Sequence, residues 1–283
     1  MTQNPSHQVH DTDETRNLLD QLLQDSRLYY RSKDYKELLD FVVQLRNFAP
    51  FNAMLLNFQK PGLSYAASKH DWWEKFKRYP NEDARPLLIL WPFGPVALVY
   101  DVQDTEGQEL PEDAFSFVAK GDMSSETFRV YTDKCKSKGI ICKMVDKGGN
   151  MAGLIRAVKR AVKKEDKPEY EIKINQNHAL PVKFNTLVHE LAHLYLGHLG
   201  KDICLKTPDR HNVAFLQREL EAESVAYLVC FRSGVKPKSH TYLAGYVRNN
   251  QSIDNIDIYQ IMRTAGQVET LLGLTLGRTG FSG

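Results

Sequence analysis

The chain has 283 residues, of which 42% are hydrophobic, 25% charged and 10% aromatic. Such a composition is typical of a globular protein that buries a sizeable core, and the length suits one large domain or two ordinary ones. The formal net charge of +2 is too small to indicate nucleic-acid or membrane binding by itself.

The cysteines and the apolar runs bear on the cellular compartment. None of the 4 cysteines stands in a CxxC pair, so the sequence predicts free thiols in a reducing compartment. The N-terminal stretch "MTQNPSHQVHDTDETR" lacks the basic and apolar regions of a signal peptide. No apolar run approaches the roughly 18 residues that a membrane span needs. We therefore expect a cytoplasmic protein with no membrane partner.

The first part of the chain predicts an α/β module over about residues 15–120. Residues 1–14 are polar and are predicted to form a mobile tail. Apolar residues at helical spacing then predict two helices that break near Ser32, and a short helix that ends at Pro61-Gly62. Two β-rich apolar runs, "RPLLILWPF" and "VALVYDVQD", flank Gly94-Pro95 and predict a hairpin.

The second part, residues 121–283, predicts a domain with a small sheet and several helices. Its first helix has Ser124 or Ser125 as the N-cap. The runs "IICKMVD" and "YEIKIN" are predicted strands. An apolar helix within "FNTLVHELAHLYLGH", a long helix that ends at Gly234 and a C-terminal helical pair follow. The expected fold class is therefore α+β.

Two segments of this second part allow more than one interpretation. The strand "YEIKIN" fits an edge position and an internal position equally well. The segment that follows the turn "KGGN" is ambiguous, but its cations recur at helical spacing beside apolar residues, which favours a solvated helix face. These cations are Arg156, Lys159, Arg160, Lys163 and Lys164.

The strongest chemical signal is the HExxH motif in "VHELAH". On a helix, His189 and His193 lie one turn apart on one face and can present two imidazoles to one metal ion. Glu190 lies about 100° around the helix from His189, so it is expected to reach a water on the metal rather than the metal itself. The apolar surroundings of the motif fit a buried active-site helix better than an ordinary core helix.

A catalytic zinc site needs a third protein ligand, and "RELEAES" on the long helix offers carboxylates. Glu219 and Glu223 share a face, whereas Glu221 points elsewhere. One carboxylate of the shared face could bind the metal and the other could hold a ligand histidine through its second ring nitrogen.

His198 is a further histidine close to the motif. It follows His193 by five positions and points away from the shared face, which favours a loop or helix-end role over ligation. The resulting pattern HExxHxxxxH also lacks the glycine turn of the three-histidine metallopeptidases. The sequence therefore favours a gluzincin-like site with a glutamate as third ligand.

With these residues identified, the chain resembles the zincin metallopeptidases of the ImmA/IrrE class, and more closely the ArdC-type antirestriction proteins. The resemblance covers about residues 15–275 and is strongest at "HELAH" and at the family pattern E-x-x-A-[DEN], here "ELEAE". A second signature, in "FAPFNAMLLNFQKPG", keeps Asn52, Gln59 and Pro61, but Ala49 replaces its serine.

The resemblance implies an N-terminal single-stranded-DNA-binding domain and a C-terminal zincin-like metallopeptidase domain. It makes Glu219 the third metal ligand and Glu223 the residue that orients a ligand histidine. Glu221 stays a rival ligand, because some relatives align on their "EA" pair. The glycine and basic turn that relatives carry after their tryptophan helix is replaced here by "RYPNEDARP", which weakens the implication of DNA binding.

Two further groups are weaker candidates. His240 and Tyr242 could stabilise an oxyanion, although the sequence favours a capping histidine and core tyrosines. The aromatic and basic residues between Trp72 and Tyr79 loosely fit a stacking platform for single-stranded DNA. Against this, Trp73 and Phe76 have the spacing of ordinary core contacts.

The sequence thus predicts a zinc metallopeptidase of narrow specificity, acting in regulation or in a mobile element. His189, His193 and Glu219 would bind Zn²⁺, Glu190 would be the general base, and the partner would be a protein or peptide substrate. The alternative is a DNA-binding, antirestriction or interaction protein whose metal site is structural or vestigial, with single-stranded DNA as a candidate partner.

Overall fold

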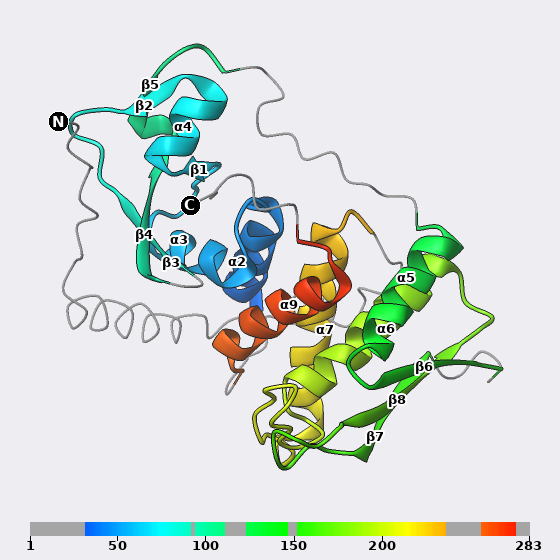
Figure 1. Cartoon of the computed structure of the whole chain (residues 1–283). Coiled ribbons are helices and arrows are strands. Elements are labelled where there is room, and N and C mark those ends of the chain that lie inside the picture. The colour runs from blue at the N-terminus through cyan, green and yellow to red at the C-terminus, as the bar shows by residue number, and fades with distance from the viewer. Residues whose placement is uncertain (1–31, 92–93, 111–122, 147–151, 236–255, 276–283) are drawn as a thin grey trace. The chain divides into compact units, whose positions relative to one another are not determined.

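The computed structural model describes residues 32–91, 94–110, 123–146, 152–235 and 256–275. Contacts within the chain divide it into two compact units. The first contains the described residues 54–110, and the second contains residues 32–53 together with the described residues from 123 to 275 (Figure 1). Both units mix helices and strands, which confirms the α+β class. The expected tail at residues 1–14 lies outside the described residues.

The first unit is built around the predicted hairpin, which the structure confirms. Strands β3 (Leu87–Trp91) and β4 (Gly94–Asp101) pair antiparallel, with Leu88 opposite Leu98. The other elements of this unit are the end of α3 (Pro50–Gln59), β1 (Ala66–Ala67), α4 (Lys69–Phe76), β2 (Arg78–Pro80) and β5 (Thr105–Gly107). Strand β1 pairs with β4, and β2 pairs with β5, so the unit holds two small antiparallel sheets.

Gln59 fastens α3 to the hairpin. Its amide nitrogen Nε2 donates to the Leu88 carbonyl at 2.8 Å, and its Oε1 accepts from the Leu88 backbone N–H at 2.7 Å. A glutamine can make this paired contact because it carries a donor and an acceptor on one amide group. The glutamine at position 59, one of the residues on which the resemblance was based, therefore has a structural role.

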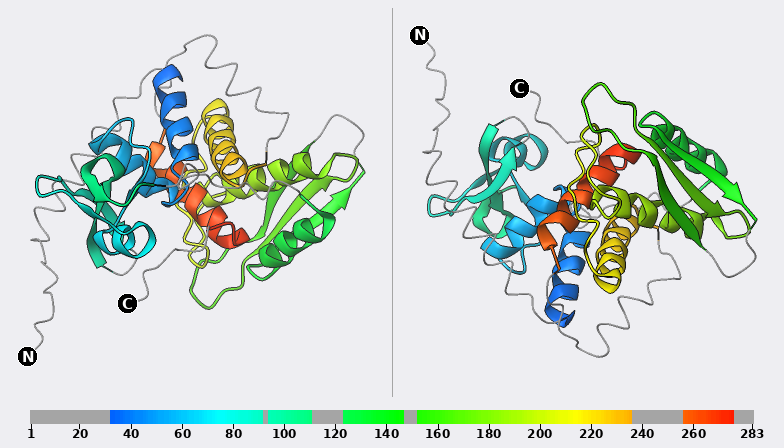
Figure 2. Two further views of the ribbon diagram at one scale, coloured as in Figure 1. Left: turned by 90° about the horizontal axis from the view of Figure 1, so that it is seen from above. Right: turned by 90° about the horizontal axis from the view of Figure 1, so that it is seen from below.

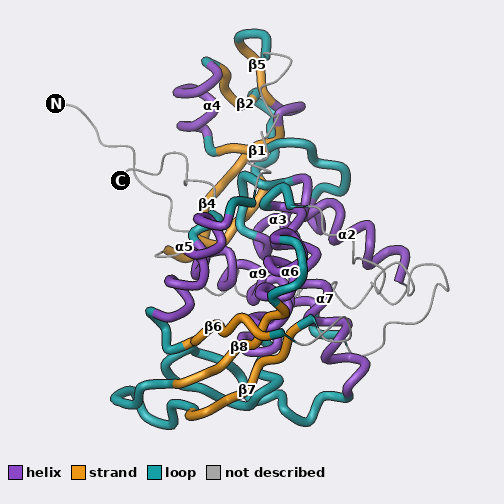
Figure 3. The backbone as a smooth tube through the Cα atoms, turned by 90° about the vertical axis from the view of Figure 1, so that its right-hand side faces the viewer, coloured by secondary structure: helices purple, strands orange, loops and turns teal. Residues whose placement is uncertain are grey.

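The second unit places one helix between a sheet and further helices. Helix α6 (Leu180–Tyr195) packs against the sheet on one side and against α7 (Phe215–Arg232) and α9 (Ile258–Leu272) on the other, as Figures 2 and 3 show. The remaining elements are α2 (Ser32–Gln44), α5 (Ser125–Lys136), β6 (Ile140–Val145), β7 (Gly153–Lys159) and β8 (Glu169–Asn175). Ser124 caps α5, as predicted, by accepting from the Thr127 N–H.

The sheet of the second unit has the order β6-β8-β7. Strand β8, the predicted strand "YEIKIN", pairs parallel with β6 and antiparallel with β7. Strand β8 is therefore the central strand of the sheet. Of the two positions that the sequence allowed, the internal one is confirmed and the edge one is wrong. The physical reason is that Tyr170, Ile172 and Ile174 are at most 1% exposed, as expected for a strand covered on its core face and paired on both sides.

Strand β7 corrects the expectation of a basic helix face. Ile155 faces the core and is 6% exposed, whereas Val158 is 56% and Val162 71% exposed. The apolar residues that matched a helical period are therefore not buried on one side. The β-branched side chains of Ile155 and Val158 lie on β7 and suit an edge strand, whereas Val162 follows the end of the strand.

Residues 32–53 belong with the second unit, and no sequence signal indicated this. The Arg232 guanidinium at the end of α7 donates to the carbonyls of Val42 and Phe48, both at 2.7 Å, and pairs with Glu269 of α9 at 2.6 Å. Because the side chains of Arg232 and Glu269 are each 6% exposed, this is a buried ion pair that joins three helical segments.

None of the helices in the described ranges has the length and apolar content that a bilayer crossing requires.

Glu171 ties the three strands of the second sheet together. This β8 residue pairs with Lys143 of β6, and its Oε1 lies 3.0 Å from Nε of Arg156 on β7. The hydrogen bonds from these two cations lower the pKa of Glu171 to about 2. The ionised carboxylate therefore interacts more favourably with its surroundings in the folded sheet than in the unfolded chain.

We predict that Glu171→Gln lowers the free energy of unfolding at neutral pH and that the variant and wild type converge in acid. A carboxyl group with a lowered pKa stabilises the fold above its unfolded pKa of about 4.5, and this stabilisation is lost as the pH falls toward about 2. Urea unfolding at several values between pH 7 and 2 measures the difference. Glu169→Gln, on the same strand but exposed, is the control, and a difference for Glu171→Gln that is independent of pH would contradict the prediction.

Candidate metal centre

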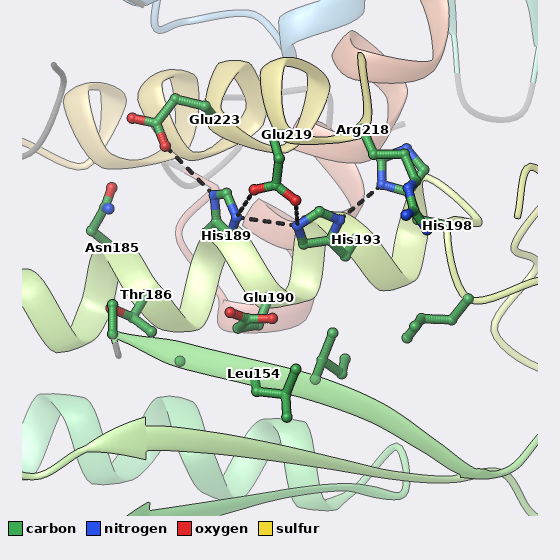
Figure 4. Close-up of a pocket in the computed structure, with 14 residues that line it drawn as sticks. Leu154, Asn185, Thr186, His189, Glu190, His193, His198, Arg218, Glu219 and Glu223 are labelled. Atoms are coloured by element: carbon green, nitrogen blue, oxygen red, sulfur yellow. Dashed lines mark hydrogen bonds and ion pairs between the residues drawn. The ribbon is translucent and has the colours of Figure 1, made fainter. Parts of the chain in front are cut away.

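Helix α6 presents the two histidines of the HExxH motif on one face. The Nε2 atoms of His189 and His193 lie 3.1 Å apart, and the two rings are nearly perpendicular, at 76° (Figure 4). The opposite side of the helix is apolar, with Leu187, Val188 and Leu191 each at 0% exposure. Burial of this apolar side against the sheet and α9 fixes the direction in which the histidines point.

Helix α7 brings Glu219 against both histidines. Its Oε2 lies 3.4 Å from His189 Nε2, and its Oε1 lies 3.5 Å from His193 Nε2. One donor atom from each of the three residues lies within 4.8 Å of the other two. The structure thus brings the three predicted ligands together, and no other such cluster occurs among the described residues.

Glu223 and Glu221 lie on different sides of α7, as helical periodicity predicts. Glu223 lies one turn beyond Glu219, with its Oε2 3.5 Å from Nδ1 of His189, the ring nitrogen that faces away from the cluster. Glu221 is 0% exposed and pairs instead with Arg210 at 2.7 Å. Of the two carboxylates considered as third ligand, Glu219 is the one that reaches His189 and His193.

His198 lies outside the cluster, as predicted, but it contacts a member of it. Its Nδ1 lies 2.9 Å from Nδ1 of His193, and its ring is 3% exposed. The chain reverses just after α6 at Gly197, whose φ of +80° favours glycine and whose missing Cβ would lie 2.2 Å from the Pro208 carbonyl oxygen. The glycine next to a histidine at a helix end is the only sequence signal that could have indicated this contact.

The donor set fits a divalent transition metal. Two imidazoles and one carboxylate are the usual protein ligands of such ions, and they leave a position for water. Burial alone would lower the pKa of His189, but its hydrogen bonds with Glu219 and Glu223 raise it to about 9. The carboxylates around His189 therefore favour a positive charge on that imidazole, whereas burial and the neighbouring His189 lower the pKa of His193 to about 3.

Glu190 points to the other side of the cleft, toward β7. Its side chain lies between the helix and the strand (Figure 4), and burial raises its pKa to about 7. A Cβ at Gly153 would lie 2.3 Å from Cγ2 of Thr186 and 3.0 Å from Oε1 of Glu190, so only glycine allows the strand to approach this closely. The backbone of Ile155 then donates a hydrogen bond to the Glu190 carboxylate.

These groups line one cleft of about 480 Å³. This volume is within the usual range for a small-molecule site. Strand β7, helix α6 and helix α7 supply its walls. Arg218 also lines it, and sequence reasoning missed this residue. Its Nε is buried and has no hydrogen-bond partner among the residues that the structure describes. His240 and Tyr242, the candidates for an oxyanion role, lie outside the described residues.

The fold and the cluster define an α+β protein with a candidate two-histidine, one-glutamate metal centre. Two solved structures are similar to the chain, both of the antirestriction ArdC protein from the R388 plasmid. The Mn(II)-bound structure has a TM-score of 0.43 and 14% identity, covering 95% of this chain and 99% of that one. The metal-free structure has a TM-score of 0.36 and 15% identity, covering 79% and 82%. No protein-family model and no curated protein matches the chain.

We predict that Glu219→Gln weakens the binding of Zn²⁺ and Mn²⁺ at least tenfold, because an amide oxygen carries no charge to attract the ion. Competition with a chromophoric chelator measures both affinities on the full chain. Glu126→Gln removes an exposed carboxylate from α5 and serves as the matched control. Equal affinity of Glu219→Gln and wild type would exclude Glu219 as a ligand.

Proposed function

We propose that the protein is a zinc-dependent metallopeptidase. The observation that carries the proposal is the buried carboxyl group of Glu190, which lines the same cleft as the three metal-ligand candidates and has a pKa near 7. A general base is most effective when its pKa lies near the working pH. An ordinary surface glutamate would not have this property.

His189, His193 and Glu219 would hold the zinc ion. When bound, zinc polarises a peptide carbonyl and lowers the pKa of water toward neutrality. Glu223 would orient His189 by accepting from its Nδ1–H. These roles use α6 and α7 and leave β7 free for the substrate.

Glu190 would move the proton in the reaction. Its carboxylate takes a proton from the attacking water, whose oxygen adds to the carbonyl carbon of the substrate. The same proton then passes to the amine nitrogen as the C–N bond breaks. The hydrogen bond from the Ile155 backbone and the close packing at Gly153 hold the carboxylate in the cleft. His240 and Tyr242 stay candidates for stabilising the oxyanion.

The substrate would be an extended segment of a protein or peptide. Strand β7 is an edge strand of the described sheet, and residues 152–155 line the cleft beside Glu190. A peptide can add to such an edge through main-chain hydrogen bonds, which brings a backbone carbonyl over the cleft. We further propose a narrow specificity, as in a regulatory or mobile-element protease.

We predict that Glu190→Gln lowers the rate of zinc-dependent peptide cleavage at least 100-fold while the zinc content stays that of wild type. General acid–base catalysis contributes on the order of 10²–10⁴-fold, and glutamine keeps the shape of the side chain without its basicity. The assay incubates the zinc-loaded protein with denatured proteins and detects new amino termini by mass spectrometry. The proposal fails if zinc-loaded wild type forms no new termini, or if Glu190→Gln forms as many.

A second candidate function is binding of single-stranded DNA by the first unit, with a structural or vestigial metal site. Trp73 is 51% and Tyr79 46% exposed, and Lys77 Nζ lies 5.1 Å from the centre of the Trp73 ring. The expectation that Trp73 is a core residue was therefore wrong; it is Trp72, at 0% exposure, that fills the core. Exposed aromatic rings beside a cation suit base stacking.

For this alternative we predict that Trp73→Ala weakens binding of a single-stranded oligonucleotide by about 5- to 150-fold, because base–aromatic stacking contributes about 1–3 kcal/mol per base. Fluorescence anisotropy at fixed salt measures the affinity. Tyr259→Ala removes an exposed aromatic residue of the second unit and is the control. Unchanged binding by Trp73→Ala, or no binding by wild type, would rule out this stacking site.

A further inference from the structure

A chain of hydrogen bonds runs from the far side of His193 into the interior. Nδ1 of His193 meets Nδ1 of His198 at 2.9 Å, and Nε2 of His198 meets Oε2 of Glu221 at 3.1 Å. Arg210 then holds Glu221 through two hydrogen bonds of 2.8 and 2.7 Å. We call these four residues the His198 relay. It begins at a metal-ligand candidate and ends at an arginine outside the cleft.

Glu221 sets the direction of the hydrogen bonds in the relay, because each group described as contacting its carboxylate can donate. Besides His198 and Arg210, the side chain of Gln217 donates to Oε1 at 3.0 Å, and the backbone N–H of Asp257 donates to the same oxygen at 3.3 Å. A carboxylate can only accept hydrogen bonds, and a guanidinium can only donate them. The carboxylate is 0% exposed, so no water competes for these positions.

The direction of every proton in the relay follows from this fixed acceptor. His198 must carry a proton on Nε2 in order to donate to Glu221. A neutral imidazole has one N–H and one lone pair, so Nδ1 of His198 is an acceptor. Nδ1 of His193 must therefore be the donor, and the lone pair of His193 is on Nε2. That nitrogen is the one that faces His189 and Glu219.

We propose that His198 is a positioning residue that keeps His193 in the Nδ1–H tautomer, with its Nε2 lone pair directed at the metal-ligand cluster. This inference rests on the metal site that the proposed function requires, but not on peptide hydrolysis. His198 is the ligand-orienting residue for His193, just as Glu223 is for His189 (Figure 4). The difference is that His193 reaches its carboxylate through a second imidazole.

The opposite polarity of the relay is unfavourable for two reasons. If Nδ1 of His198 donated to His193, a neutral His198 would present a lone pair to the Glu221 carboxylate, and two acceptors would face each other in a buried place. A doubly protonated His198 would avoid this, but it would bury a second cation beside Arg210, whose charge already matches that of Glu221. The geometry therefore favours a neutral His198 with its proton on Nε2.

The first test reads the tautomer directly in the metal-free full chain. Long-range ¹H–¹⁵N spectra of the imidazole rings distinguish a protonated Nδ1 from a protonated Nε2. We expect wild-type His193 to be protonated on Nδ1 in its neutral form, and His198→Leu to lose this preference. A wild-type His193 that carries its proton mainly on Nε2 overturns the proposal without any variant being made.

The second test measures Zn²⁺ affinity by competition with a chromophoric chelator. His198→Leu is expected to lose 10- to 100-fold, the usual effect of removing a residue that orients a metal ligand. His198→Asn places an acceptor oxygen where Nδ1 was and should remain within about threefold of wild type. His211→Leu changes an exposed histidine of the same loop and is the control. Wild-type affinity for His198→Leu overturns the proposal.

The two proposals can fail separately. If the tautomer and the affinities follow these expectations but no peptide is cleaved, the relay stands and the hydrolysis does not. If His198→Leu lowers only the melting temperature, with His193 and the Zn²⁺ affinity unchanged, His198 is a packing residue and the relay proposal is wrong.

Discussion

The arrangement of the second unit depends on the buried contact between Glu221 and Arg210. Helix α7 carries carboxylates on two sides, and only one side can face α6. Because Glu221 is enclosed by Arg210 and by the backbone of Asp257 at the start of α9, the helix cannot rotate without leaving a charge unpaired in the interior. The opposite side, with Glu219 and Glu223, is thereby held against the histidines. One ion pair outside the cleft thus determines which carboxylates enter it.

The two carboxyl groups in the cleft have opposite electrostatic environments. Glu219 has a lowered pKa because it accepts from His189, and burial against β7 raises the pKa of Glu190 to about 7. A site with two carboxyl groups whose pKa values diverge in this way can assign one to charge and the other to proton transfer. The division follows from the surroundings of each group: Glu219 of α7 meets the two imidazoles, and Glu190 of α6 meets strand β7.

Much of the site could be predicted because helical periodicity relates residues that are close in sequence. The spacing of His189 and His193, and the separation of Glu219 from Glu221, both follow from 3.6 residues per turn. The contacts of His198 depend on long-range packing, and so does the packing of residues 32–53 with the second unit. No local pattern encodes either. Strand β7 was missed because two of its residues, Ile155 and Val158, fit a helical period together with Val162 beyond the strand. Only the pairing with β8 shows that the segment is a strand.

Gly153 allows β7 to lie close to α6 at the edge of the cleft. The distance between β7 and α6 is limited by the absence of one methyl group, since a Cβ there would lie 2.3 Å from Thr186. A larger side chain at residue 153 would clash with Thr186 and Glu190, so either the strand or these two side chains would have to move. The metal-ligand candidates are on α6 and α7 rather than on the strand. The close approach of β7 to α6 therefore depends on one strand residue that is not itself a metal-ligand candidate.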